Sequence, residues 1–322
     1  MPHASTPLRL LTLSFIILCF FSCGKEKIEL LWEEQSSPVN STLNSVYFTD
    51  INTGYAVGGD VWTKGYSLST LDGGITWVAD SLGDKSMFGL DFSNDGVGYA
   101  VGVDGYFYRK LSPQEDWTFH RLHRWDILRD VDYNEEGVGV VVGGIAFQQG
   151  AFMRVEGAWS MERDTFEKEL AAVCFSDNER VHAAGYGIML QSNDTGKTWT
   201  QLNIDGDFFR AIDFPSSNVG YVVGSGGTIM KTTNGGDDWK KIRKGEKVGV
   251  KDIPFRDVHF VDENIGYIVG EGGVFWRTLN GGDDWQEVKG FPDVDLLGVH
   301  VVDGLGYIVG EKGRIFRFEE GL

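Results

Sequence analysis

Short apolar runs alternate with clusters of Gly, Asn and Asp along nearly the whole chain after its N-terminal segment. In residues 256–285 the apolar runs begin at Val258, Tyr267, Val274 and Trp285. The segments between them are Asp-Glu-Asn, Gly-Glu-Gly-Gly and Asn-Gly-Gly-Asp, whose residues favour tight turns. Runs of this length, rich in Val, Ile, Tyr and Phe and bounded by turn residues, predict β-strands. The pattern therefore predicts four strands in about 30 residues and no helix.

The same unit recurs along the chain. Seven tryptophans are separated by 45, 40, 42, 40, 40 and 46 residues, and a Gly-Tyr-Ala/Val/Ile-Val-Gly motif recurs with the same period. A fixed period near 40 residues indicates one supersecondary unit repeated along the chain. Four antiparallel strands in each of seven repeats predict an all-β, seven-bladed β-propeller, whereas a β-helix or solenoid would use shorter repeats. The tryptophans are Trp32, Trp77, Trp117, Trp159, Trp199, Trp239 and Trp285.

The two ends of the chain predict how the ring closes. The last repeat stops at residues 314–318, after its third strand, and has no final turn or tryptophan. Trp32 precedes the first complete repeat. We therefore expect residues 32–35 to form the fourth strand of the last blade, which joins the two termini and leaves no open sheet edge between blades.

Four of the repeats end in a finer pattern, Ser/Thr-x-Asp/Asn-x-Gly-x-x-Trp, called the Asp-box or bacterial neuraminidase repeat. The repeats that end at Trp117 and Trp159 have lost it. We interpret the Asp or Asn as a structural residue that accepts N–H groups within its own turn. The alternative, a catalytic carboxylate, is less favoured because catalysis needs such a residue once, not four times. The four positions are Asp72, Asp194, Asn234 and Asn280.

The combined motifs resemble a known family. Arg/Leu-Asp-Val-x-Phe, Gly-Tyr-x-Val-Gly and Asn/Asp-Gly-Gly-x-x-Trp together resemble the photosystem II assembly and stability factor family of seven-bladed propellers. The resemblance covers residues 32–318, and it is strong at 40–77 and 200–318 and weak between 112 and 185. It implies a protein-binding scaffold rather than an enzyme.

The N-terminal segment resembles a lipoprotein signal. Residues 10–21 form a mostly apolar run that is too short to span a bilayer, and it ends at Ser22-Cys23. We expect a signal peptide at 1–22, an acylated Cys23 that begins a tether at 23–31, and the propeller at 32–322. This predicts an exported protein, held by lipid in a bacterial cell envelope. An ordinary secretory signal that happens to end near a cysteine is the alternative.

Charge and cysteine content exclude several classes of partner. Without residues 1–22 the chain has 28 basic and 47 acidic side chains, a formal net charge of −19. A field of that sign repels nucleic acid and anionic membrane surfaces, so any membrane attachment depends on the lipid. No CxxC, HExxH or clustered His pattern exists, and we expect no metal and no cofactor. Cys174 lies in an apolar strand, where we expect a buried small hydrophobe.

An arginine is expected to open the first strand in three of the repeats: Arg129, Arg210 and Arg256. First strands line the axis of a propeller, so these side chains are expected to share one funnel and to bind an acidic or C-terminal group of a partner. In the alternative, each arginine pairs with a neighbouring carboxylate, for instance Asp130 or Asp257, and only holds its loop.

The segment from His120 to Asp126 is the densest basic and aromatic stretch of the chain. Within it, His123, Arg124 and Trp125 are candidate partner-binding residues, since an exposed Trp beside Arg is a frequent interface anchor. A plain connection with Trp125 tucked beneath it is the alternative.

Two functions fit these observations. The first is a non-catalytic, lipid-anchored scaffold that binds a protein partner or assists assembly of an envelope complex. The second is a glycan-binding or glycoside-hydrolysing propeller, because some glycosidases carry Asp-boxes. We favour the scaffold, since a two-carboxylate mechanism needs one specific acid pair and the sequence singles out none. The sequence says nothing about oligomeric state.

Overall fold

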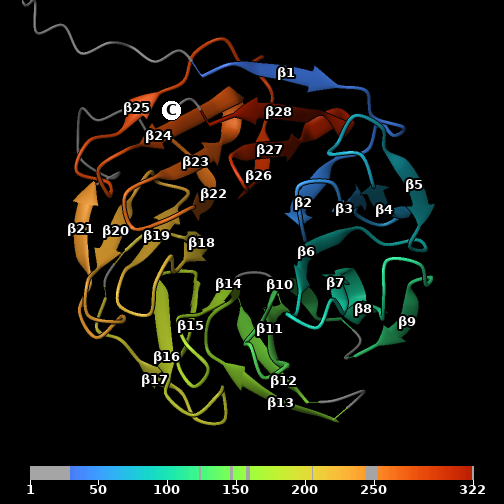
Figure 1. The fold of residues 1–322 in the computed structure, drawn as a ribbon. Coiled ribbons are helices and arrows are strands. Elements are labelled where there is room, and N and C mark those ends of the chain that lie inside the picture. The colour runs from blue at the N-terminus through green and yellow to red at the C-terminus, as the bar shows by residue number, and fades with distance from the viewer. Residues whose placement is uncertain are drawn as a thin grey trace, which may run out of the picture.

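A computed structural model describes seven four-stranded antiparallel sheets arranged radially around one axis (Figure 1). The predicted seven-bladed propeller is therefore confirmed. The described residues are 30–122, 125–145, 148–156, 160–204, 206–243 and 253–320. The signal peptide expected at 1–22, the lipidation site Cys23, and the loop residues His123 and Arg124 lie outside these ranges.

The strands follow the chain from the axis outward in each blade. Blades 1 to 3 are β2 (Leu43–Phe48), β3 (Gly54–Asp60), β4 (Lys64–Thr70), β5 (Val78–Ser81); β6 (Met87–Phe92), β7 (Gly98–Gly102), β8 (Tyr106–Lys110), β9 (Thr118–Arg121); and β10 (Ile127–Tyr133), β11 (Val138–Ile145), β12 (Gln149–Glu156), β13 (Ser160–Phe166). Blades 4 and 5 are β14 (Leu170–Phe175), β15 (Val181–Gly185), β16 (Ile188–Ser192), β17 (Thr200–Gln201); and β18 (Phe209–Asp213), β19 (Gly220–Gly224), β20 (Ile229–Thr232), β21 (Lys240–Arg243). Blades 6 and 7 are β22 (Phe255–Phe260), β23 (Gly266–Gly270), β24 (Val274–Thr278), β25 (Gln286–Glu287); and β26 (Leu296–Val302), β27 (Leu305–Gly310), β28 (Ile315–Glu319), β1 (Trp32–Gln35). Single 3-10 turns are η1 (Val103–Gly105), η2 (Glu271–Gly273) and η3 (Glu311–Gly313).

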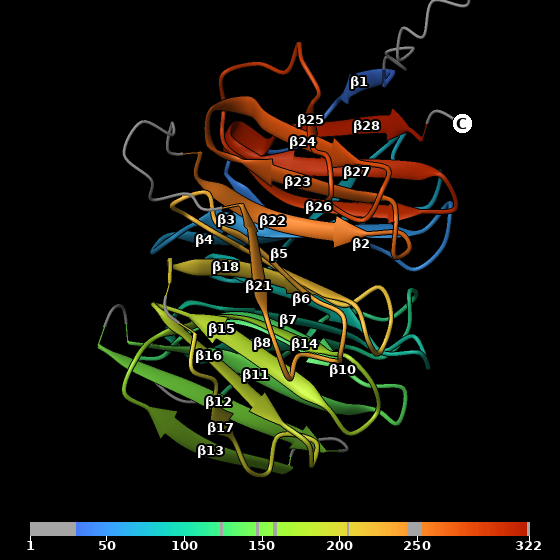
Figure 2. The same cartoon turned by 90° about the vertical axis from the view of Figure 1, so that its left-hand side faces the viewer.

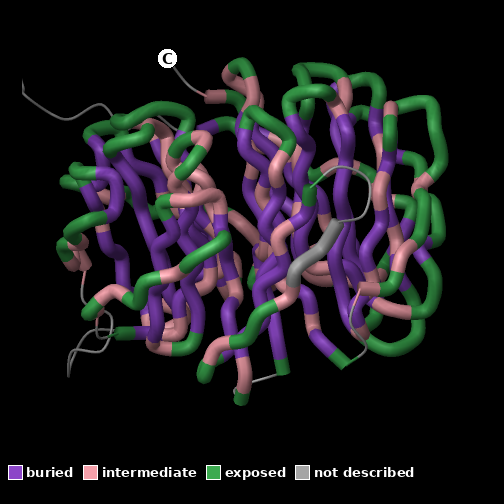
Figure 3. Tube along the Cα trace, turned by 90° about the horizontal axis from the view of Figure 1, so that it is seen from below, coloured by how far each residue is buried: buried purple, intermediate pink, exposed green. Residues whose placement is uncertain are grey.

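The turns lie on two opposite faces (Figure 2). Connections between blades and turns between second and third strands share one face, which we call the funnel face. Turns between first and second strands share the other face with the Asp-box turns, as the bond from the Gly73 N–H to the Asn52 carbonyl shows (2.9 Å). Buried residues occupy the middle of the strands, and exposed residues gather on the turns (Figure 3).

The Gly-Tyr motif forms the contact between blades. A Cβ added to Gly266 would lie 2.4 Å from the ring of Phe260, which ends the first strand of the same blade. The outer face of that ring stacks on Tyr221 of the preceding blade, with centroids 3.6 Å apart and planes at 7°. The pair formed by Phe48 and Tyr307 repeats this geometry at 3.6 Å and 11°. Glycine is thus required where the aromatic ring lies against the second strand.

Buried carboxylates join the inner strands of neighbouring blades. Asp257 accepts the Val258 N–H of its own strand (2.9 Å) and the Val299 N–H of the next blade (2.8 Å). Asp213 accepts the N–H of Phe260 in the next blade (2.6 Å). These bonds satisfy donors on strand edges that no sheet partner reaches. Burial raises the pKa of Asp257 to about 7.

The predicted closure of the ring is also confirmed. Strand β1 pairs antiparallel with β28, with Trp32 opposite Phe318 and Gln35 opposite Ile315. Trp32 stacks on Phe291 with centroids 4.4 Å apart. Because β28 ends on the Asp-box face, β1 begins there, and the carbonyl of Leu31 accepts the Glu319 N–H on that side (3.2 Å).

Each Asp-box side chain accepts the N–H of the residue four positions further on. The distances are 2.9 Å to Thr76, 2.8 Å to Thr198, 3.0 Å to Asp238 and 2.9 Å to Asp284. The turns also receive hydrogen bonds from the preceding blade. The carbonyl of Gly73, for example, accepts the hydroxyl of Tyr307 (3.0 Å).

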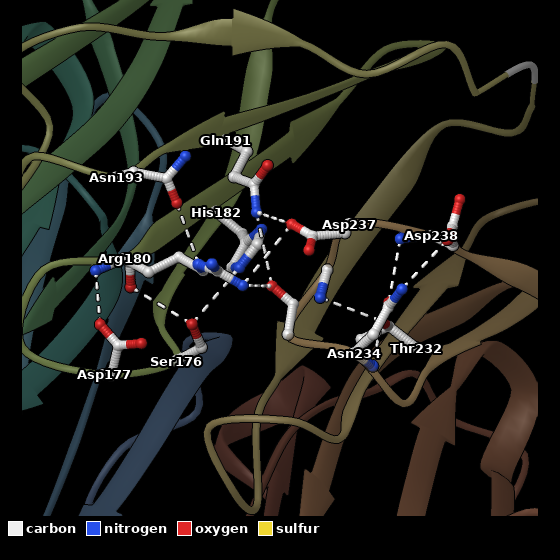
Figure 4. Close-up of polar contacts among 12 residues, drawn as sticks. Ser176, Asp177, Arg180, His182, Gln191, Asn193, Thr232, Asn234, Asp237 and Asp238 are labelled. Carbon is white, nitrogen blue, oxygen red and sulfur yellow. Dashed lines mark hydrogen bonds and ion pairs between the residues drawn. The ribbon is translucent and has the colours of Figure 1, made fainter.

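Blade 4 carries a histidine where five other blades have the motif tyrosine. His182 is fully buried and stacks on Phe214 of blade 5, with centroids 4.5 Å apart. Arg180 and Gln191 replace the missing hydroxyl, since both donate to the Gly235 carbonyl in the Asp-box of blade 5 (2.8 and 3.4 Å; Figure 4). Burial, and then the charge of Arg180, lower the pKa of His182 to about 3.

We expect this histidine to make the fold sensitive to acid. Below a pH of about 6.5 the unfolded chain protonates His182, whereas the native chain does so only near pH 3, so stability falls with falling pH. Between pH 6.5 and 5 the loss from this one group is about 2 kcal/mol, at about 1.4 kcal/mol per unit. Urea unfolding of His182→Phe should show a pH dependence flatter by that amount. Parallel curves for the variant and wild type would contradict this assignment.

Candidate functional site

Every inner strand is interrupted at the same place by a β-bulge, where its register to the second strand shifts by one residue. A bulge turns its extra side chain away from the regular alternation of a strand. The seven extra residues all line one cavity of about 230 Å³ on the axis, near the funnel face, which we call the funnel. In blade order they are Asn44, Phe88, Arg129, Ala171, Arg210, Arg256 and Leu297.

The three arginines predicted to share a funnel do so. They do not open their strands as expected, because each occupies the bulge one or two residues inside: Arg129 in β10, Arg210 in β18 and Arg256 in β22. The bulge is what aims these otherwise alternating positions at the axis. Blade 4, between Arg129 and Arg210, contributes only the small Ala171, which leaves space among the guanidiniums.

Two of the arginines are paired with carboxylates, but not with those that the sequence suggested. Arg129 donates to Glu169, with 2.8 Å from Nη2 to Oε1, and Arg256 pairs with Glu271. The expected partners are engaged elsewhere, since the carboxylates of Asp130 and Asp257 accept N–H groups of the next blade. Glu169 and Glu271 lie outside the first strands, so no strand pattern indicated them.

Arg210 has no carboxylate within ion-pair distance among the described residues. Its Nε donates to the hydroxyl of Ser225 (2.7 Å), and its guanidinium lies 3.8 Å from the ring centroid of Phe208. Burial, and then the charges of Arg256 and Arg129, lower its pKa to about 10. Arg210 therefore stays cationic at neutral pH, and a bound anion would relieve the repulsion. The funnel thus holds three guanidiniums beside the carboxyl groups of Asp130 and Asp257, and among the described residues only the guanidinium of Arg210 has no ion-paired carboxylate.

The other half of the ring is not cationic. The side-chain amide of Asn44 donates hydrogen bonds to the Met87 carbonyl (2.7 Å) and the Ser86 hydroxyl (3.2 Å) of the next blade. Phe88 lies beneath Arg129, with 5.0 Å from the guanidinium carbon to the ring centroid. The apolar Leu297 completes this half. These residues were missed by the sequence reasoning because only the arginines were compared, although aligning the bulge position of all seven repeats would have found them.

Trp125 is 78% exposed and stands on the funnel face, so the interpretation in which its ring is tucked beneath the connection is wrong. Its backbone has a φ of 77°, which is unfavourable for a bulky residue. Its N–H donates to Asp104 (3.1 Å), and the neighbouring Asp126 accepts two bonds from Arg163 (2.9 and 3.1 Å). The backbone of Trp125 and the side chain of the following Asp126 are therefore both bonded to blades 2 and 3, whereas the indole ring is exposed.

A second cavity of about 410 Å³ lies at the opposite end of the axis, between blades 3 and 4. Its lining includes Asp132, Glu135 and Asp177, so it repels anions. Cys174 also lines it and is half-buried rather than buried as expected, and burial raises the pKa of its thiol. Within the described ranges, no group of His, Cys, Asp or Glu is arranged to hold a metal ion.

Known proteins share both sequence and fold with this chain. The family model of the photosynthesis system II assembly factor YCF48 matches residues 201–298. The photosystem II assembly lipoprotein Ycf48 of Trichormus variabilis is 26% identical over 176 residues, 52% of each chain. The protein of the same name from Synechocystis sp. is 30% identical over 149 residues, 43% of each chain. The chain thus spans about half the length of the curated relatives it matches.

The chain is therefore a β-propeller that is similar in sequence to the photosystem II assembly factor YCF48 over part of its length. Solved structures of other proteins have the same fold as this chain. YCF48 bound to a D1 peptide has a TM-score of 0.69 at 18% identity, covering 90% of this chain and 96% of that one. YCF48 from Cyanidioschyzon merolae has a TM-score of 0.68 at 17% identity, covering 89% and 98%. A virginiamycin B lyase from Staphylococcus aureus scores 0.74 at 10% identity, covering 90% and 99%, so the fold by itself does not separate binding from catalysis.

We expect the two kinds of funnel arginine to differ in their effect on stability. Arg129→Met removes the charged partner of a carboxylate that is 0% exposed and should lower the free energy of unfolding by about 3 kcal/mol. Arg210→Met removes a cation without a carboxylate partner and should leave stability unchanged or raise it by about 1 kcal/mol. Guanidinium unfolding of both variants checks this. Equal losses in the two variants would show that Arg210 stabilises the fold as Arg129 does.

Proposed function

We propose that the propeller is a non-catalytic binding scaffold that holds an acidic group of a protein partner in the funnel, and that it assists the assembly of an envelope complex. The observation that carries the proposal is Arg210, a partly buried cation without a carboxylate partner among the described residues, beside two further arginines. Burying such a charge opposes folding, so its presence at a converging site favours a role in binding.

The comparisons support a protein partner. The relatives are named assembly lipoproteins, and one structural neighbour was solved with a D1 peptide bound. A rigid disc with a recessed charged centre suits the capture of a flexible segment, because the scaffold loses little freedom when it binds. The partner of this chain is defined here by its chemistry, an accessible carboxylate on a polypeptide.

The glycosidase alternative has less support. The buried acids of the inner strands, such as Asp213 and Asp257, accept backbone N–H groups of the next blade, a structural use of their oxygens. The Asp-box side chains are likewise engaged within their own turns. Asp130 and Asp257 line the funnel, but each of them uses both carboxylate oxygens to accept backbone N–H groups.

Partner capture by immobilised protein from detergent-solubilised membranes of the cells that make it tests the proposal. We expect Arg210→Ala to reduce recovery of a specific partner at least ten-fold, because the carboxylate loses its unpaired counter-charge. Arg314→Ala is the matched control, since it breaks only an exposed pair with Glu34 (3.1 Å) on the outer edge of blade 7. Undiminished recovery by Arg210→Ala, or turnover of aryl-glycoside reporters by wild type, would refute the proposed function.

The lipid anchor is a separate part of the proposal. A tether at 23–31 spans at most about 30 Å and joins β1 on the Asp-box face, so acylation at Cys23 would leave the funnel face pointing away from the membrane. Within the described residues, no helix has the length and apolar character needed to cross a membrane.

Metabolic labelling with palmitate tests the anchor. We expect wild type and Cys174→Ser to incorporate label and to sediment with membranes, and Cys23→Ser to do neither. Cys174 belongs to an inner strand, so its substitution controls for labelling at another thiol. Label retained in Cys23→Ser would place the modification elsewhere.

A further inference from the structure

The funnel is too small to enclose more than the end of a ligand. Its volume of about 230 Å³ lies below the roughly 300–1,000 Å³ of sites that bury a whole small molecule. A polypeptide whose carboxylate enters the funnel must therefore lay its remaining residues across the funnel face. The blades that the polypeptide crosses depend on which side chains are exposed on the funnel face around the arginines.

Blades 1 and 2 offer an apolar surface. Trp62, in the turn between β3 and β4, is 63% exposed, and Trp125, in the connection from blade 2 to blade 3, is 78% exposed. Phe88 lies inward of them at the bulge of blade 2, partly exposed to the funnel. All three belong to the funnel face of two adjacent blades. Of the three, Phe88 lies against Arg129, with 5.0 Å from the guanidinium carbon to the ring centroid.

Exposed tryptophans on a rigid frame are typical of binding anchors. A large ring left in water opposes stability, and interfaces concentrate their binding energy in such residues. The Trp125 N–H is bonded to Asp104, and Asp126 is paired with Arg163, so the backbone at the base of the exposed ring is fixed before a partner covers it. The exposed Tyr186 on the far side of the funnel differs, because it packs edge-on against Phe208, with centroids 5.5 Å apart.

We propose that Trp62, Phe88 and Trp125 form an apolar subsite that receives an aromatic or aliphatic side chain of the partner. The occupant is an extended C-terminal segment whose terminal carboxylate lies among the arginines and whose apolar residue lies a few positions earlier. Charge complementarity fixes the carboxylate end, and the apolar half of the ring fixes the direction in which the segment leaves. This inference rests on the proposed function and adds a specificity that the arginines alone do not supply.

A peptide scan tests the subsite. The probes are fluorescein-labelled decapeptides of Gly, Ser and one Asp, with a free or amidated C-terminus, in which a single Phe is moved from the third to the eighth position before the end. We expect one or two positions of Phe to tighten binding of the free-acid peptide about ten-fold in fluorescence anisotropy. Trp62→Ser and Trp125→Ser should each remove most of that gain.

Controls separate this inference from the proposed function. Ile75→Ser removes a residue 64% exposed on the Asp-box face and should keep the full gain. If the Phe-dependent increase in affinity persists in the double variant Trp62→Ser/Trp125→Ser, or is lost in Tyr186→Ser instead, the proposed subsite is wrong. Carboxylate-dependent binding without any effect of Phe position would also overturn it and leave the proposed function standing. No difference between free-acid and amidated peptides would refute both.

Discussion

The contact between adjacent blades is the interaction on which the rest of the structure depends. Each sheet is small, and its apolar faces are buried only against its neighbours. The stack of a second-strand tyrosine on the aromatic ring that ends the next first strand, as in Tyr221 and Phe260, sets the spacing between sheets. Glycine behind that ring lets it lie flat against its own blade. The same stack, between Tyr307 and Phe48, joins the last blade to the first, and β1 completes the sheet of the last blade.

The funnel follows from the same geometry. Inner strands converge on the axis, and a bulge in each one turns a single side chain into the shared space. Because the bulge is a backbone feature present in every blade, the side chain at that position is free to vary. The chain uses this freedom unevenly, with Arg129, Arg210 and Arg256 on one side and Phe88 and Leu297 on the other. The seven blades are arranged symmetrically, but the funnel that they form has one cationic side and one largely apolar side.

Much of the fold could be predicted because its signals are local and repeated. Turn residues, strand-forming runs and a fixed period do not depend on distant contacts, so blade number, strand count and closure were all correct. The site was harder. The arginines were found by their equivalent positions, but their partners Glu169 and Glu271 come from segments without a repeated pattern. The exposure of Trp125 could not be predicted from the composition of the segment around it, since a connection rich in Arg and His is compatible with either a buried or an exposed ring.

The sequence by itself determined the repeat, the class of fold and the closing strand, because period and alternation are properties of the chain. Only the tertiary structure decided which charges meet. Asp130 and Asp257 are nearest to the arginines in sequence, yet their oxygens are taken by N–H groups of the next blade. Arg129 and Arg256 therefore pair with carboxylates brought in by other segments, and Arg210 is left without one among the described residues. The distances between blades determine which arginine keeps a guanidinium free of a carboxylate partner, and no single repeat of the sequence encodes these distances.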